Sequence, residues 1–181
     1  MNLSALLPYT SAACCFALGL AAMLRAGRLV DRWAFVAGMF AMAAEGTVNG
    51  LSANAVWPED IARWQQWRLL AAAVIPGLWL LFSRSYSRGS EQKQFSLRLL
   101  PWACAAAVPA GIVVAFWDGL LVSRQFDGDA GGWVFRLGWP ALLVHGMLLL
   151  ISVAALTNLE GTFRASVGTM RWRIKYMLLG V

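Results

Sequence analysis

Charged residues are scarce in this sequence: Asp, Glu, Lys and Arg make up 13% of the 181 residues, whereas hydrophobic residues make up 60%. A soluble domain of this length needs a more polar surface than such a composition supplies. The apolar residues also lie in blocks instead of an amphipathic or alternating pattern, as expected for segments surrounded by lipid. The composition therefore excludes an ordinary soluble domain and indicates an integral membrane protein.

Cysteine and histidine are also few, with three Cys and one His. Cys14 and Cys15 are neighbours in the first apolar block and Cys104 lies in a later one, so we expect buried small apolar residues and not a disulfide framework. His145 alone cannot form a metal site, and the sequence has no Gly-rich phosphate loop, metal-spaced Cys/His cluster or Gly-x-Ser-x-Gly elbow. We predict no catalytic centre, cofactor or metal in this chain.

One acidic loop invites comparison with a calcium site. Asp127, Asp129 and Gly131 have the spacing of an EF-hand loop, but Gly138 stands where the bidentate Glu would be needed. The stretch instead predicts a turn between two short extended segments.

Long apolar blocks make up most of the sequence. A helix needs roughly 20 mainly apolar residues to cross the hydrocarbon core. Five blocks approach that length and a sixth begins near the C-terminus: 6–24, 33–53, 64–82, 99–117, 137–156 and 170–181. The first block has no basic residues before it, which favours a retained span over a signal peptide. Prolines within the blocks predict kinks and not breaks. We therefore expect an all-α polytopic transmembrane helix bundle, a single domain over residues 1–181 with five complete spans and the start of a sixth.

The basic residues predict the orientation. Four lie in the connections after the second and fourth blocks: Arg63, Arg68, Arg124 and Arg136. Eleven lie in the other connections and at the start of the sixth block: Arg25, Arg28, Arg32, Arg84, Arg88, Lys93, Arg98, Arg164, Arg171, Arg173 and Lys175. The positive-inside rule places the N-terminus outside. Orientation and anionic lipid also account for the net charge of +6, so no nucleic-acid partner is expected.

The segment WPEDIARWQQWR predicts the start of a helix. Pro58 suits the first turn, and Glu59 and Asp60 suit the positive end of the helix dipole. The helix is expected to run on into the third block. Tryptophans near the block ends are expected to lie at the membrane interface.

Glu45, in the second block, is the residue least compatible with lipid. A carboxylate there costs about 2.5–3.5 kcal/mol on insertion scales, so it should be neutral, paired or turned to a polar interior. Asn49 lies one turn further on the same face. Gly46 and Gly50 form a small-xxx-small pair that predicts the close approach of another helix.

His145 is a possible partner of Glu45 because the two have similar depths. With a rise of 1.5 Å per residue, both lie roughly 12–13 Å below the outer surface of a core about 30 Å thick. Two interpretations stay open: a ligand-binding, proton-sensing or quinone-type pocket, or a polar clamp that holds the bundle together.

The stretch NLEGTFRASVGTMRWRIKYMLLG has a more specific pattern. It resembles the end of the multi-pass N-terminal region of exosortase/PEP-CTERM-system sensor histidine kinases (PrsK-type). The matching residues, expected in a cytoplasmic loop and at the start of the sixth span, are Asn158, Leu159, Glu160, Phe163, Arg164, Arg171, Trp172, Ile174, Lys175 and Tyr176.

The resemblance implies the membrane-embedded signal-input region of a two-component sensor in the inner membrane of a bacterium, truncated before its kinase domain. The parent protein would be a homodimer that transfers phosphate from ATP, with Mg²⁺, to its own His and then to a response regulator. No catalytic or ATP-binding residue is carried over to this chain. The alternative is a small membrane transporter or a quinone- or proton-linked protein that uses Glu45.

Overall fold

Helix α3, Pro58–Ser87, begins where the sequence predicts, with Pro58 at its first position and Glu59 and Asp60 in its first turn. It continues through Pro76 for 30 residues.

The computed structural model describes residues 3–24, 29–87, 100–127 and 132–165. Before α3 come α1, Leu3–Met23, and α2, Leu29–Asn54; after it come α5, Leu100–Ala115, and α6, Trp139–Ala165. Pro8 and Pro109 also lie inside helices, so the expectation that proline does not break them is confirmed.

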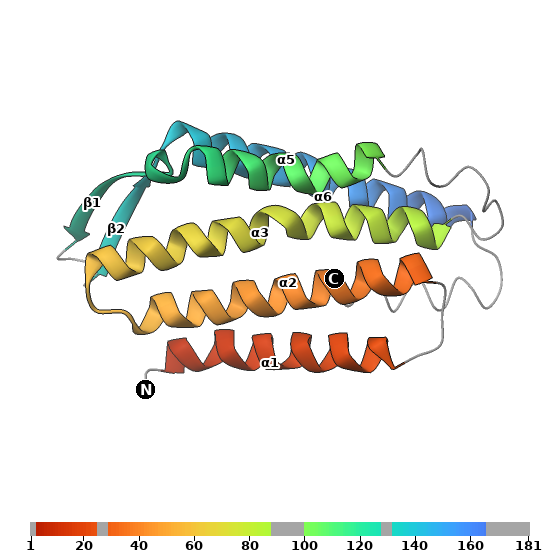
Figure 1. Ribbon diagram of the computed structural model, residues 1–181, viewed down its shortest axis with the longest axis horizontal. Coiled ribbons are helices and arrows are strands. Elements are labelled where there is room, and N and C mark those ends of the chain that lie inside the picture. Colours follow the sequence, from red (N-terminus) through yellow and green to blue (C-terminus); the bar gives the residue numbers. More distant parts are fainter. Residues whose placement is uncertain (1–2, 25–28, 88–99, 128–131, 166–181) are drawn as a thin grey trace.

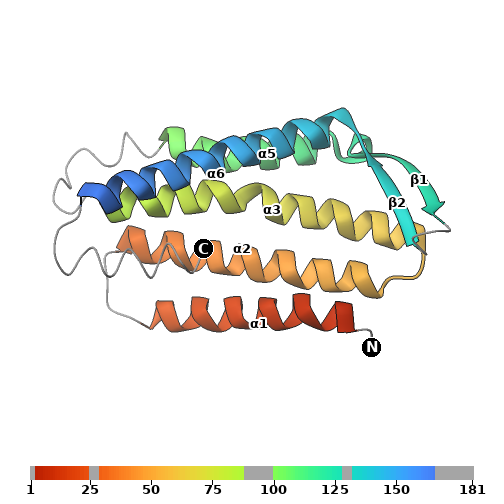
Figure 2. The ribbon, with the colours of Figure 1, turned by 180° about the vertical axis from the view of Figure 1, so that it is seen from behind.

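The helices run side by side along one direction, with α1, α2 and α3 in a row and α5 and α6 together beyond α3 (Figures 1 and 2). Helix α1 packs on α2, α2 packs on α3, and α3 contacts both α5 and α6. Helix α3 is thus the central element, and α1 forms one edge of the row.

The predicted glycine pair is confirmed as a close-packing site. A Cβ atom on Gly46 would lie 3.1 Å from the carbonyl oxygen of Pro8, and one on Gly50 would lie 2.7 Å from the ring of Tyr9. The helix that approaches these glycines is α1. Glycine acts in the same way between α3 and α5, where a Cβ on Gly77 would lie 2.5 Å from the Cα of Ala106.

Two apolar clusters stabilise the bundle. Near the hairpin end, Ala73 of α3, Val113 of α5 and Val144 of α6 are fully buried together with Leu120 and Ala141. Near the opposite end, Phe35 of α2 packs against Trp79 and Phe82 of α3 with ring centroids 5.6–5.9 Å apart. These clusters join α3 to its neighbours at both ends.

Much of the remaining helix surface is apolar and exposed. On α1 these include Leu7, Phe16 and Leu18, and on α6 Leu149 and Leu150 are 66% and 71% exposed. Among the described residues, four helices are long and apolar enough to cross a membrane: the spans are Leu6–Met23, Arg32–Asn54, Pro58–Ser85 and Trp139–Gly161. The chain is therefore a mostly helical, multi-pass membrane protein whose exposed surface is suited to the lipid bilayer.

The fourth predicted span, 99–117, is shorter than expected. Helix α5 ends at Ala115, and its 16 described residues reach about 24 Å at 1.5 Å per residue, less than the roughly 30 Å of a bilayer core. The predicted start of a sixth span, 170–181, lies outside the described residues.

The prediction of a purely α-helical fold was wrong in one segment. Strands β1, Leu121–Asp127, and β2, Gly132–Leu137, form an antiparallel hairpin, with Leu121 opposite Leu137 and Asp127 opposite Gly132. Two short extended segments were predicted here, and that prediction is confirmed. The block predicted from residue 137 instead has its first residue in β2, and its helix starts at Trp139.

The cysteines were expected to be buried. All three are free, but Cys14 and Cys104 are exposed on the outer faces of α1 and α5, and Cys15 is half-buried. Their small apolar side chains suit lipid as well as a protein core.

Candidate functional site

A cavity of about 430 Å³ lies between α3, α6 and the hairpin. Helical periodicity brings Ile61, Gln65, Arg68, Leu69 and Ala72 to one face of α3, and all five line the cavity. The alternation of strand β2 brings Trp133, Phe135 and Leu137 to one face of the hairpin, and these form the facing wall. His145 contributes from α6, and Gln66, Leu120 and Leu121 complete the lining.

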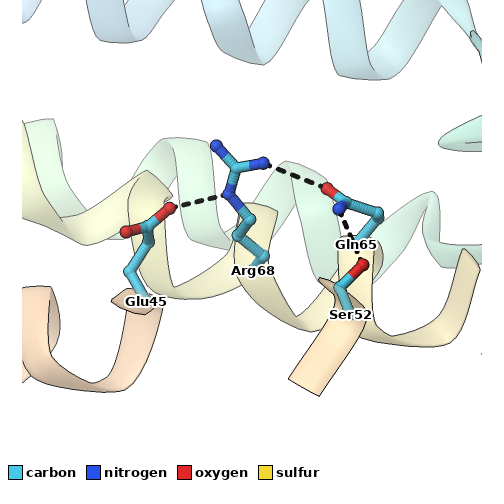
Figure 3. A network of polar contacts seen from close by, with 4 residues as sticks. All are labelled: Glu45, Ser52, Gln65 and Arg68. Carbon is cyan, nitrogen blue, oxygen red and sulfur yellow. Dashed lines mark hydrogen bonds and ion pairs between the residues drawn. The ribbon is translucent and has the colours of Figure 1, made fainter. Parts of the chain in front are cut away.

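Glu45 is paired, although not with the predicted partner. Arg68 Nε donates to Glu45 Oε1 at 2.7 Å, which joins α2 to α3 through a charge-assisted hydrogen bond (Figure 3). The Glu45 side chain is 26% exposed and the Arg68 side chain 41%. The guanidinium thus neutralises the carboxylate and is still accessible from the cavity.

The ion pair extends into a polar network. Arg68 Nη1 donates to Gln65 Oε1 at 3.2 Å, and Gln65 Nε2 donates to Ser52 Oγ at 2.8 Å (Figure 3). Ser52 and Glu45 lie on α2, and Gln65 and Arg68 lie on α3. The network therefore ties these two helices together twice and fixes the position of the Arg68 side chain.

His145 has a different environment from the one considered in the sequence. Its Nδ1 lies 2.7 Å from the carbonyl oxygen of Ala141 in the preceding turn of α6. Because a carbonyl oxygen only accepts, Nδ1 is the donor, and in the neutral imidazole Nε2 is then an acceptor. Among the described residues, no hydrogen bond or ion pair joins His145 to Glu45. Arg68 links the two positions, because it pairs with Glu45 and lines the same cavity as His145.

The other intramembrane candidates are separate from the cavity. Asn49 is half-buried on α2 and is not among the lining residues. Gly46 and Gly50 pack against α1. In the part of the chain that the structure describes, no three His, Cys, Asp or Glu side chains are placed to hold a metal ion.

The segment expected as a cytoplasmic loop is helical in its first half. Asn158, Leu159, Glu160, Phe163 and Arg164 all lie in the last turns of α6, so their assignment to a loop was wrong. Glu160 and Arg164 form an exposed ion pair one turn apart, which contributes little to stability. The residues Arg171, Trp172, Ile174, Lys175 and Tyr176 lie outside the described residues.

Asn158 makes a contact that its sequence context did not indicate. Its Nδ2 donates to Ser83 Oγ at 3.0 Å, and the fully buried Ser83 hydroxyl donates to the carbonyl oxygen of Leu80. Leu159, beside it, is 4% exposed. This contact joins α6 to α3 at the end of the bundle away from the cavity.

We expect Asn158→Ala to lower the free energy of unfolding by about 1 kcal/mol, the usual value of an interhelical hydrogen bond in a membrane protein. Thermal unfolding in nanodiscs measures the change. Thr157→Ala is the matched control, since among the described residues the exposed Thr157 hydroxyl donates to Val153 within α6 and not to another helix. Equal losses in the two variants would contradict a role for the α3–α6 contact.

The sequence contained a signal for the partner of Glu45. Glu45 lies nine residues before the end of α2 and Arg68 ten residues after the start of α3, so both lie about 14–15 Å from the connection between the helices. Arg68 lies within the predicted third block, 64–82, and not only in the outer connection, which gives it a depth similar to that of Glu45. The hairpin wall and the two glutamines were also missed, because only the tertiary structure brings them together.

Comparisons with known proteins add no assignment. No protein-family model matches the sequence, and searches among curated proteins and solved structures find no match.

Proposed function

We propose that this chain is the membrane-embedded signal-input region of a two-component sensor histidine kinase, and that the α3–α6–hairpin cavity receives the signal. The observation that carries the proposal is the cavity itself. It combines apolar and aromatic walls with a few polar groups, as small-molecule sites do. The two helices that line it, α3 and α6, continue to the opposite end of the bundle, where Ser83 and Asn158 join them.

The resemblance of residues 158–176 to PrsK-type sensors supports the kinase assignment. In this proposal the chain has its N-terminus outside, five spans and a sixth that follows α6, in the inner membrane of a bacterium. The catalytic parts lie in a cytoplasmic domain that binds ATP and Mg²⁺, acts as a homodimer and phosphorylates a response regulator. A transporter or proton-linked protein that uses Glu45 is less well supported, because Arg68 already engages this carboxylate.

The native polypeptide tests the proposal. We expect the in-frame coding sequence beyond Val181 to encode further apolar helices, a phospho-accepting His and an ATP-binding domain. The purified full-length protein in nanodiscs should then incorporate label from γ-labelled ATP at a His. A stop codon directly after Val181, or full-length protein that takes up no label, would contradict the sensor-kinase assignment.

The proposed orientation places the hairpin outside the cell. Gln125 is exposed on β1, and we expect Gln125→Cys, in a chain without its three native cysteines, to react with a membrane-impermeant maleimide added to intact cells. Gly161→Cys, near the other end of α6, is the matched control and should react only after the cells are opened. The reverse pattern would show that the N-terminus faces the cytoplasm.

A further inference from the structure

The polar groups of the cavity define the kind of molecule that it accepts. Arg68 has five N–H donors, of which the described contacts use one on Nε and one on Nη1. The remaining donors are suited to an acceptor atom on a ligand. The charge of Arg68 is already balanced by Glu45 at 2.7 Å, so the site does not need a second anion.

His145 and Gln66 offer hydrogen-bond acceptors to a ligand, whereas Arg68 offers donors. With Nδ1 donating to Ala141, Nε2 of the neutral His145 ring is an acceptor. Gln66 donates through Nε2 to the carbonyl oxygen of Trp117 at 2.9 Å, which leaves its Oε1 as a further acceptor at the cavity. A ligand that satisfies this side must carry an O–H or N–H donor.

The apolar walls and the volume of the cavity indicate the shape and polarity of the main part of the ligand. Trp133 and Phe135 present aromatic surface, and Leu120, Leu121 and Leu137 present aliphatic surface. Aromatic side chains pack well against another ring in offset or edge-to-face geometry. The volume of about 430 Å³ lies within the range of roughly 300–1,000 Å³ found for small-molecule sites.

We propose that the α3–α6–hairpin cavity binds a neutral, lipid-soluble phenol of the hydroquinone type. One hydroxyl donates to His145 Nε2, an oxygen accepts from Arg68, and the ring packs against Trp133 and Phe135. The inference rests on the proposed function only in taking this cavity as the input site. The proposal concerns reversible binding and involves no electron transfer to the protein.

Binding to the full chain in nanodiscs tests the proposal, with the signal of empty nanodiscs subtracted. The probes are a decyl-substituted benzohydroquinone kept reduced, its dimethyl ether, the corresponding benzoquinone, and decanoate as an anionic amphiphile. We expect saturable binding of the hydroquinone, with the dimethyl ether and the quinone bound at least about tenfold more weakly because neither has a hydroxyl donor. Because these comparisons use the unaltered protein, they do not depend on whether a variant folds.

The variant His145→Phe keeps a ring but removes the acceptor, and it should weaken hydroquinone binding about tenfold while leaving the affinity for the dimethyl ether unchanged. Trp139→Phe is the matched control, because this exposed residue of α6 does not line the cavity. Equal binding of hydroquinone and dimethyl ether, absence of saturable hydroquinone binding, or preferential binding of decanoate would each overturn the proposal.

The binding experiment is independent of kinase activity. Hydroquinone binding by a protein whose full-length form takes up no phosphate would leave the ligand assignment intact and refute the sensor function. Kinase activity without hydroquinone binding would refute the ligand assignment alone.

Discussion

Replacing Arg68 by Met is expected to lower the free energy of unfolding by about 2–3 kcal/mol, because it leaves the Glu45 carboxylate without a counter-ion at membrane depth. The value lies below the 3–5 kcal/mol typical of fully buried pairs since both side chains are partly exposed. Chemical or thermal unfolding in nanodiscs measures the loss.

A double-mutant cycle separates the ion pair from general packing. Glu45→Gln alone should cost about 1 kcal/mol, because the amide oxygen can still accept from Arg68 Nε and the guanidinium is accessible from the cavity. Combining Glu45→Gln with Arg68→Met removes both charges and should recover stability to within about 1 kcal/mol of the unaltered protein. Simple addition of the two single losses would show that the two residues act independently.

The second large effect is expected at Gly77. A methyl group there would lie 2.5 Å from both the Cα and the Cβ of Ala106, so Gly77→Ala must move α5 away from α3. Backbone atoms cannot rotate aside, and we expect a loss at the upper end of the roughly 1–3 kcal/mol found for overpacking. Unfolding in nanodiscs again measures the change.

Gly146→Ala is the matched control for Gly77→Ala. Gly146 lies within α6, and a Cβ at this position meets no atom within 4 Å among the described residues. The higher helix propensity of alanine should leave the stability unchanged or slightly raised. Similar losses in the two variants would mean that contact with Ala106 is not the cause.

Most of the helical architecture could be predicted from the sequence, because a membrane span needs about 20 mainly apolar residues and such runs are visible along the chain. The start of α3 at Pro58 followed from local rules for helix N-termini. The close approach of α1 to Gly46 and Gly50 followed from the spacing of small residues. These features depend on neighbours in the sequence.

The polar site depends on residues far apart in the sequence, and it was predicted less well. Depth arguments placed Glu45 at the level of His145 but did not show which helices are neighbours, and α3 is the helix that lies beside α2. The cavity required the hairpin, whose strands were expected while the face that they present to α3 was not. The helical course of Asn158–Arg164 was missed because polar residues were assigned to a loop, although α6 simply continues through them.

The proline within α3 has a mechanical consequence. Pro76 has no backbone N–H, so the carbonyl oxygen of Ala72, a residue that lines the cavity, lacks its usual partner four residues later. The loss of this hydrogen bond weakens α3 beside the cavity, because a proline is a usual site of bending in a helix. On one side of this point lie Gln65 and Arg68, and on the other lies Ser83 with its bond to Asn158. A molecule bound in the cavity would therefore lie beside the proline of α3, which separates the cavity from the Ser83–Asn158 contact.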